Sequence, residues 1–222
     1  EADAVLEACR RNGTVFNSGV LRRFDNRYQT LRFAIEQGAI GEPRAVVFYG
    51  AMELIHNHIH TIDTMSYFLG DPGIEAVRGE FQPRSWEIQN NRIDMDPQGD
   101  FGIIFANGVK ACSVPAAPME YEIVGTEGSV RTLNNGGGVL MRKARETTER
   151  HGKQQWEEIE PPQLELQNAV TACLEDLVNA HESGGSTLGN IETAHHITEA
   201  VFAAAESHRL GGGWVELPLK AR

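Results

Sequence analysis

LIHNHIHTIDTMSYFLG, residues 54 to 70, contains three of the eight histidines in this chain of 222 residues. The three histidines alternate with other residues, and apolar side chains then recur every three or four positions, at Ile59, Ile62, Met65 and Leu69. This spacing is typical of a helix that buries one face. The stretch therefore predicts a helix, with the densest group of chemically active side chains at its start.

The opposite face of this predicted helix is polar. His60, Asp63 and Tyr67 follow one another at spacings of three and four residues, which places them on one side of the helix. His56 lies one turn earlier, at the beginning of the element. We interpret this side as a candidate reactive surface.

The composition is that of an ordinary globular protein. Hydrophobic residues make up 41% of the chain, which is ample for a core. The formal net charge is -11, and basic residues form only short pairs such as Arg22 and Arg23, so a nucleic-acid partner has little support. No apolar run approaches the roughly 18 residues of a membrane span, and the first residues do not resemble a signal peptide. We expect a cytoplasmic protein with no membrane partner.

The cysteines are three in number and widely spaced, at Cys9, Cys112 and Cys173. An odd number of cysteines among apolar neighbours favours reduced thiols in the core over a disulfide framework or a zinc site. We assign none of them a catalytic role.

The chain before the histidine stretch predicts two helices and two strands. The first helix ends at Gly13, and a strand-like segment, Thr14–Leu21, follows it. A second helix is predicted at Tyr28–Gln37 and a second strand at Ala45–Ala51, which leads into the histidines. After the histidine helix, Asp71-Pro72-Gly73 predicts a turn.

From Ile74 to about Ile159 the hydrophobic periodicity falls to two, which predicts an antiparallel sheet. Turn residues such as Asn107-Gly108 are expected to keep successive strands paired. The predicted strands are 74–82, 99–106, 109–115, 119–125, 129–133, 138–144 and 156–159. Two helices, Leu164–His181 and Ile191–Leu210, and a last short strand, Trp214–Leu217, follow them.

Strands followed by helices indicate an α+β architecture, here an open, mostly antiparallel sheet with helices on one face. The segments FGIIFA and VKACSV carry apolar groups toward both faces of the sheet, whereas one layer of helices covers only one. The second face therefore needs a partner, and we expect a homodimer or a homotetramer that forms through the sheet face.

Four segments carry a family resemblance. In order, they are GVLRRFDNRY with IEQGAIGEP, then HIHTIDTMSYFLGD, EIVGTEGSVR and NIETAHHITEAVFAAAESHRLGGGWVELPL, and together they span Gly19 to Leu219. Their order and spacing resemble the C-terminal part of the glucose-fructose oxidoreductase, inositol dehydrogenase and MocA (Gfo/Idh/MocA) family. The resemblance implies an open sheet like that of the C-terminal domain of glyceraldehyde-3-phosphate dehydrogenase.

The same resemblance implies a two-domain oxidoreductase whose N-terminal Rossmann half binds NAD or NADP. Residues 1–21 would be the last helix and strand of that half, and residues 22–222 the C-terminal substrate and oligomerisation domain. The family's Glu-Lys-Pro lysine has no counterpart, since the first lysine is Lys110, and no GxGxxG joins a strand to a helix. We therefore expect cofactor binding to lie outside this sequence and the chain alone to be inactive.

The family's Asp-x-x-x-His pair maps onto His56 and His60, so the resemblance implies that both are catalytic and that a histidine replaces the usual aspartate. Oxidation of an alcohol needs a base near neutral pH, and an imidazole with an ordinary pKa of about 6.5 suits this task. We predict contacts to a small sugar or polyol substrate from Arg23, Asp63 and Tyr67.

Other assignments stay open at this point. Arg22 and Arg23 are candidate contacts to the substrate or the cofactor half, Arg22 as the candidate for the cofactor, although a solvated pair beside Asp25 is nearly as well supported. His58 faces away from His60 on a helix, which favours a supporting role behind the site or exposure to solvent. Zinc or manganese on the three histidines and Asp63 is an alternative, but we expect no metal, because residues at i, i+2 and i+4 cannot converge from a helix.

Two classes of function remain. The first is the substrate and oligomerisation part of an NAD(P)-dependent oxidoreductase that acts on a sugar, polyol or related hydroxyl substrate. The second is a stand-alone, non-catalytic sugar-binding or scaffold domain. The first is favoured, because a strand and helix left from a parallel sheet need the rest of that sheet to cover their apolar faces.

Overall fold

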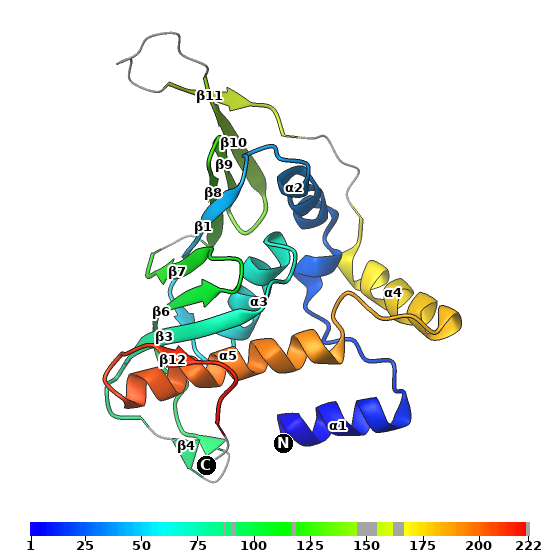
Figure 1. The fold of residues 1–222 in the computed structure, drawn as a ribbon, viewed down its shortest axis with the longest axis vertical. Helices are drawn as coiled ribbons and strands as arrows, with labels where there is room; N and C mark the ends of the chain where they lie inside the picture. The colour runs from blue at the N-terminus through cyan, green and yellow to red at the C-terminus, as the bar shows by residue number, and fades with distance from the viewer. Residues whose placement is uncertain (87, 90–91, 117–118, 146–154, 162–166, 221–222) are drawn as a thin grey trace.

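The computed structural model describes residues 1–86, 88–89, 92–116, 119–145, 155–161 and 167–220. Its centre is an open sheet of ten strands, with a separate pair of short strands beside it (Figure 1). From one edge to the other the sheet contains β11 (Trp156–Ile159), β10 (Gly138–Ala144), β9 (Gly128–Leu133), β8 (Glu120–Gly125), β1 (Pro43–Tyr49), β7 (Lys110–Val114), β6 (Gln98–Phe105), β3 (Ile74–Gln82) and β12 (Val215–Glu216). The remaining strand, β2 (Met52–Glu53), pairs with β6, and the separate pair is β4 (Ile88–Gln89) and β5 (Arg92–Ile93).

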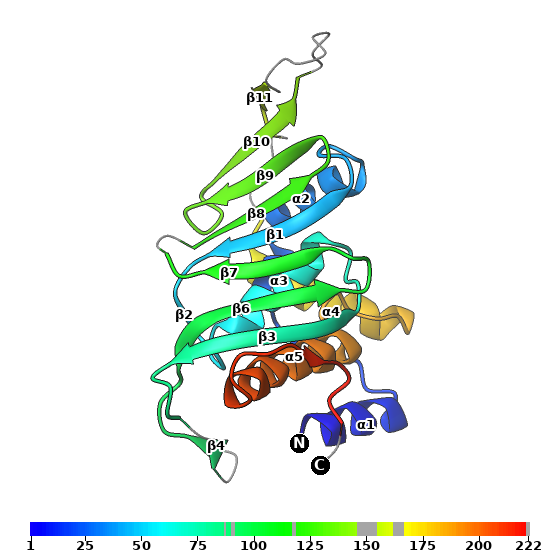
Figure 2. The same ribbon diagram turned by 60° about the vertical axis from the view of Figure 1, so that its left-hand side comes forward.

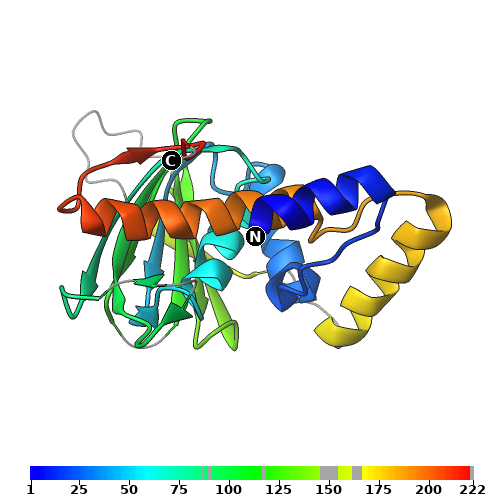
Figure 3. The same ribbon diagram turned by 90° about the horizontal axis from the view of Figure 1, so that it is seen from below.

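The helices lie on one face of this sheet, as the α+β prediction requires. Figure 2 shows them behind the strands. They are α1 (Ala2–Asn12), the 3-10 helix η1 (Leu21–Phe24), α2 (Asn26–Glu36), α3 (His58–Phe68), α4 (Ala169–Ser183) and α5 (Ile191–Arg209). Helix α5 runs along β3, α1 packs beside α5, and α4 projects away from the sheet (Figures 1 and 3). None of the described helices is long and apolar enough to cross a membrane.

Strand register determines which residues lie on the face of the sheet that the helices cover and which lie on the opposite face. Residues paired directly across neighbouring strands share a face. One row, from β9 to β3, consists of Val130, Ile123, Val46, Ala111, Ile103 and Val77, all buried under the helices. The adjacent row faces the other way and consists of Arg131, Glu122, Val47, Cys112, Gly102 and Arg78. No helix of the described ranges covers this second row (Figure 2).

The sequential pairing expected from short turns is wrong at one place. Strand β1 lies between β7 and β8, parallel to β7 and antiparallel to β8. Strands β7 and β8, which follow one another in the sequence, are therefore separated by β1. On its helix-facing side β1 buries Val46 and Phe48, which suits a place in the centre of the sheet.

The strand predicted at Thr14–Leu21 is also wrong, because this segment has no strand beside it in the described chain. Its backbone instead bonds to the loop between α4 and α5: Ser18 donates its N–H to the carbonyl of Gly189, 2.8 Å away. The hydroxyl of Thr187 donates to the carbonyl of Phe16 over 2.5 Å. These bonds take the place of the backbone hydrogen bonds to a neighbouring strand that a β-strand would make.

The other predicted elements are confirmed to within a few residues. Gly13 ends α1 in the left-handed conformation, with φ 61°, and Gly108 turns the β6–β7 hairpin with φ 81°. Helix α4 begins at Ala169, and the predicted helical residues 164–166 lie outside the described ranges. Asn168 caps α4 by accepting hydrogen bonds from the N–H groups of the first turn.

Candidate functional site

Helix α3 is enclosed by the sheet on one side and by η1, α2 and α5 on the others. From Thr61 to Phe68 every side chain is buried. Only the first turn reaches solvent, where His56 and His60 are exposed. The predicted polar face is therefore reduced to these two histidines, because neighbouring elements cover the rest of the helix.

His58 points away from His60, as the helical spacing predicted, and into the core, so the expected alternative of a solvent role is wrong. Its ring is fully buried, packs edge-on against Phe101 at 4.8 Å, and donates from Nε2 to the carbonyl of Gly99, 3.2 Å away. Its Nδ1 is buried without a hydrogen-bond partner in the described chain. Burial lowers the pKa of His58 to about 4, which keeps the ring neutral.

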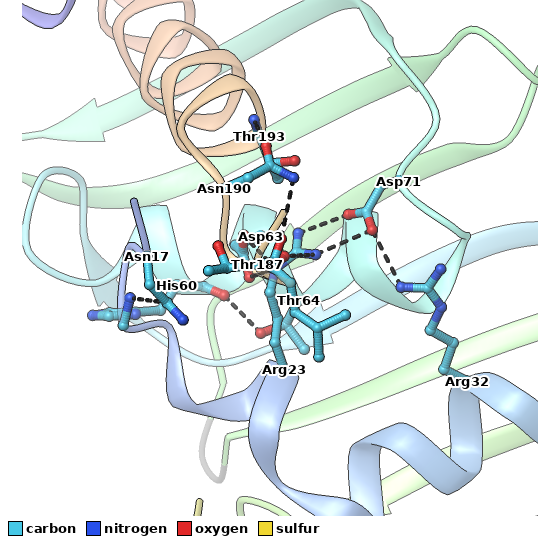
Figure 4. Close-up of polar contacts among 12 residues, drawn as sticks. Asn17, Arg23, Arg32, His60, Asp63, Thr64, Asp71, Thr187, Asn190 and Thr193 are labelled. Carbon is cyan, nitrogen blue, oxygen red and sulfur yellow. Dashed lines mark hydrogen bonds and ion pairs between the residues drawn. The ribbon is translucent and has the colours of Figure 1, made fainter. Parts of the chain in front are cut away.

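Arg23 is the centre of a buried polar cluster (Figure 4). Its Nε donates to both carboxylate oxygens of Asp63 at 3.0 and 2.9 Å, and its NH2 group donates to Asp71 over 2.7 Å. The carbonyl of Leu188 accepts a further bond at 3.3 Å. Burial opposes the Arg23 charge, but the bonds to Asp71 and Asp63 outweigh it, so the pKa of Arg23 is raised. The cluster joins η1, α3, the turn after α3 and the α4–α5 loop.

Tyr67 completes this cluster. The guanidinium groups of Arg23 and Arg32 lie over its ring at 5.1 and 4.5 Å from the ring centre. Arg32 also pairs with Asp71 at 3.2 Å (Figure 4). The three predicted substrate contacts, Arg23, Asp63 and Tyr67, are thus brought together, but each is buried and they face one another. Direct contact with a substrate stays a prediction, and the geometry favours a role in holding α3 in place.

Arg22 lies on the other side of η1, near the exposed histidines. It donates to Asn135 over 2.7 Å, and its guanidinium carbon lies 6.0 and 5.8 Å from the ring centres of Tyr28 and Tyr121. Both phenol oxygens are buried without a hydrogen-bond partner among the described residues. Burial raises the pKa of Tyr121 to about 12, so this hydroxyl remains a donor. Nothing in the sequence around Tyr28 or Tyr121 distinguishes them from core tyrosines.

His60 has the electrostatics of a neutral base. Partial burial of the ring lowers the pKa of His60, and the positive charges of Arg22 and His56 lower it further. An uncharged imidazole at neutral pH can accept a proton. The first turn of α3 therefore presents one exposed, neutral histidine beside an arginine.

The described residues contain no group of three or more His, Cys, Asp or Glu side chains that could hold a metal ion. The inward direction of His58 and the outward direction of His56 and His60 explain why the histidines do not converge. A cavity of about 620 Å³ lies at the far end of α3, where Leu69, Gly41 and Thr126 line it. This cavity does not include the exposed histidines.

Comparisons with known proteins address the fold and the family. Residues 50–217 match the model of an oxidoreductase family's C-terminal alpha/beta domain. No curated protein sequence matches the chain.

Solved structures show the same fold at low sequence identity. An NAD binding oxidoreductase from Klebsiella pneumoniae is 16% identical, with a TM-score of 0.76 over 99% of this chain and 70% of that one. An aldose-aldose oxidoreductase from Caulobacter crescentus, complexed with glycerol, is 20% identical, with a TM-score of 0.71 over 97% and 68%. An inositol dehydrogenase homolog from Azotobacter vinelandii, complexed with NADH and myo-inositol, is 14% identical, with a TM-score of 0.72 over 97% and 68%.

Proposed function

The chain belongs to the Gfo/Idh/MocA oxidoreductase family, and from this premise we propose that it is the substrate-binding and oligomerisation part of an NAD(P)-dependent oxidoreductase. Its substrate class is a sugar, polyol or related hydroxyl compound, as the names of the structural relatives suggest. The observation that carries the proposal is His60, a neutral and exposed imidazole at the start of α3 beside Arg22.

In this proposal His60 removes the proton from a substrate hydroxyl group. An alcohol loses its hydride more easily when a base takes the hydroxyl proton at the same time. Arg22 contacts the substrate or the cofactor half. In contact with the substrate, its positive charge stabilises negative charge that develops on the substrate oxygen. Arg23, Asp63 and Tyr67 hold α3, and through it His60, in position.

The chain's own residues do not suit a dinucleotide. A pyrophosphate needs a glycine-rich turn at the start of a helix within a βαβ unit, and this sequence has no such turn. We therefore assign the nicotinamide cofactor, NAD or NADP, to a domain outside these residues and only the proton transfer to this chain. In the same proposal residues 1–21 belong structurally to that domain and residues 22–222 form the substrate domain.

Calorimetric titration of the chain with NAD(H) and NADP(H) tests this division. We expect no heat of binding. Micromolar affinity would contradict the assignment of the cofactor to another domain and would favour a site that lies within this chain.

Substitution of His60 in the full-length enzyme tests the catalytic proposal. With a panel of sugars and polyols and either cofactor, His60→Ala should lower kcat and kcat/KM together, by a factor on the order of 10² to 10⁴. His181, exposed near the end of α4, provides the matched control His181→Ala. If His60→Ala lowered thermal stability and left turnover unchanged, His60 would be a packing residue and the proposal would fail.

We further propose that the chain associates through the open face of its sheet. The ends of the open row are charged: Arg131 pairs with Glu120 at 2.6 Å, and Arg78 lies over the ring of Trp214 at 5.5 Å. The middle of the row, Val47 and Cys112, is small and apolar. A patch with both charge signs around an apolar centre can be complementary to a second copy of itself in a homodimer or homotetramer.

A further inference from the structure

The turn before α3 owes its shape to a carboxylate from a distant part of the chain. Asp96 accepts the N–H of Ile55 on Oδ1 over 2.9 Å and the N–H of His56 on Oδ2 over 2.8 Å. The neighbouring N–H of Leu54 donates to the carbonyl of Pro97, 2.9 Å away. Three successive backbone groups before the histidine turn are therefore bound by two adjacent residues.

This carboxylate binds the backbone directly before the N-cap residue of α3, Asn57. Ile55 and His56 precede the helix, so their N–H groups are not part of its hydrogen-bond ladder and need another acceptor. Asn57 makes no side-chain cap bond, and its amide nitrogen donates to Glu53. A carboxylate that accepts two N–H groups makes charge-assisted bonds, and its negative charge is favourable at a helix N-terminus.

Asp96 is itself held by the sheet. It lies at the end of the connection from β3 to β6, which carries the short strands β4 and β5 (Figure 2). One side of this connection is fixed where the Trp86 ring stacks on His208, with ring centres 5.4 Å apart. The other side enters β6, whose first residues pair with β2, Gly99 opposite Met52. The chain is therefore held on both sides of Asp96, by Trp86 before it and by β6 after it.

We propose that Asp96 is a positioning residue for the exposed His56–His60 pair: by binding the backbone of Ile55 and His56 it orients the turn that presents both imidazoles. This inference rests on the proposed function for its catalytic meaning. The geometry of the turn itself is independent of it. Burial lowers the pKa of His60 most, and the charges of Arg22 and His56 lower it further, so this pKa reports the surroundings of the ring at the start of α3.

The sign of the pKa change separates positioning from a simple charge effect. Loss of a negative charge near an imidazole lowers its pKa. We expect loss of the turn geometry to have the opposite effect, because a ring that is less buried and farther from Arg22 has a pKa nearer the ordinary value of about 6.5. The measurement is an NMR titration of the imidazole ring protons of this chain between pH 4 and 8, with His60 assigned by His60→Gln.

We expect Asp96→Ala to raise the pKa of His60. Asp96→Glu keeps the charge but moves it by one methylene, and we expect it to raise the pKa as well. Asp94→Ala is the matched control, because Asp94 is exposed on the same connection and its removal changes the net charge equally. Circular dichroism confirms the fold of each variant, and Asp96→Asn replaces Asp96→Ala if the latter does not fold.

A pKa of His60 that falls or stays the same in both Asp96 variants would overturn the inference. Kinetics of the full-length enzyme then separate the two proposals. If Asp96→Glu raises the pKa of His60 and His60→Ala leaves turnover unchanged, the positioning role holds and the catalytic proposal fails.

Discussion

Arg23 and Asp63 form an ion pair with 2.9 Å between Nε and Oδ2, and their side chains are only 1% and 3% exposed. The two residues are 40 positions apart in the sequence, on η1 and α3. Two charges lose most of their hydration when they are buried, so a pair of this kind persists only if its hydrogen bonds are satisfied. The second carboxylate, Asp71, meets this need by binding the other end of the guanidinium group.

The first prediction is that breaking this pair destabilises the whole domain. Arg23→Met leaves the Asp63 carboxylate buried without its cation, and we expect the free energy of unfolding to fall by about 3–5 kcal/mol. Urea denaturation followed by circular dichroism measures the change. The control is Arg44→Met, because Arg44 pairs with Glu42 at the surface and should cost less than about 1 kcal/mol. Equal losses for the two variants would contradict the central role of Arg23.

The second prediction concerns acid stability. Burial lowers the pKa of His58 to about 4, so between pH 6.5 and 4 the unfolded chain binds a proton that the folded chain does not. The stabilisation from a neutral His58 is therefore complete above about pH 6.5 and is lost as the pH falls toward 4, by an amount on the order of 3 kcal/mol.

His58→Phe tests this second prediction, because phenylalanine fits an aromatic site and does not titrate. We expect a shallower fall of the unfolding free energy between pH 6.5 and 4, and part of the slope should remain because burial also lowers the pKa of His196. His181→Phe, at an exposed position, should leave the slope as it is in the wild type. An unchanged slope in His58→Phe would show that His58 is protonated in the folded chain.

The third prediction concerns the replacement of the family's aspartate. The His56 charge lowers the pKa of His60, so His56→Gln should raise this pKa, and His56→Asp should raise it further because a carboxylate stabilises the imidazolium form. NMR titration of the isolated chain measures both. In the full-length enzyme His56→Asp should move the acidic limb of the pH–rate profile upward. The pKa of His60 should rise in the order wild type, His56→Gln, His56→Asp. Any other order would show that the two side chains do not interact.

The fourth prediction is that the open sheet face mediates self-association. Val47 lies in the middle of the open row, so Val47→Glu should place a charge in the contact and favour monomers in light scattering at high concentration. Leu174→Glu, on the exposed surface of α4 and 58% exposed before substitution, should not change the mass. A wild-type chain that is monomeric at all concentrations would contradict this prediction.

The secondary structure and the class of the fold followed from local signals in the sequence. Alternating apolar residues such as Phe101, Ile103 and Phe105 bury one face of a strand, and Gly108 turns the chain with a positive φ that glycine favours. The helix over the histidine stretch followed from apolar spacing in the same way, as did the different directions of His58 and His60, which lie two positions apart. These features depend on neighbours within a few residues. The burial of His58 in the core did not follow from this spacing.

Tertiary structure decided what the sequence left open. The insertion of β1 between β7 and β8 pairs segments that are far apart in the sequence, which no local turn signal encodes. Asp63 and Tyr67 have the spacing of an exposed polar face, but η1 and α2 bring Arg23 and Arg32 over them, so they became a buried cluster. Nothing in the sequence relates Asp96 to the histidines, because it lies 40 positions from His56. Contacts between distant residues form only when the chain folds into its tertiary structure. For that reason the local pattern located the histidines, while the packing determined their surroundings.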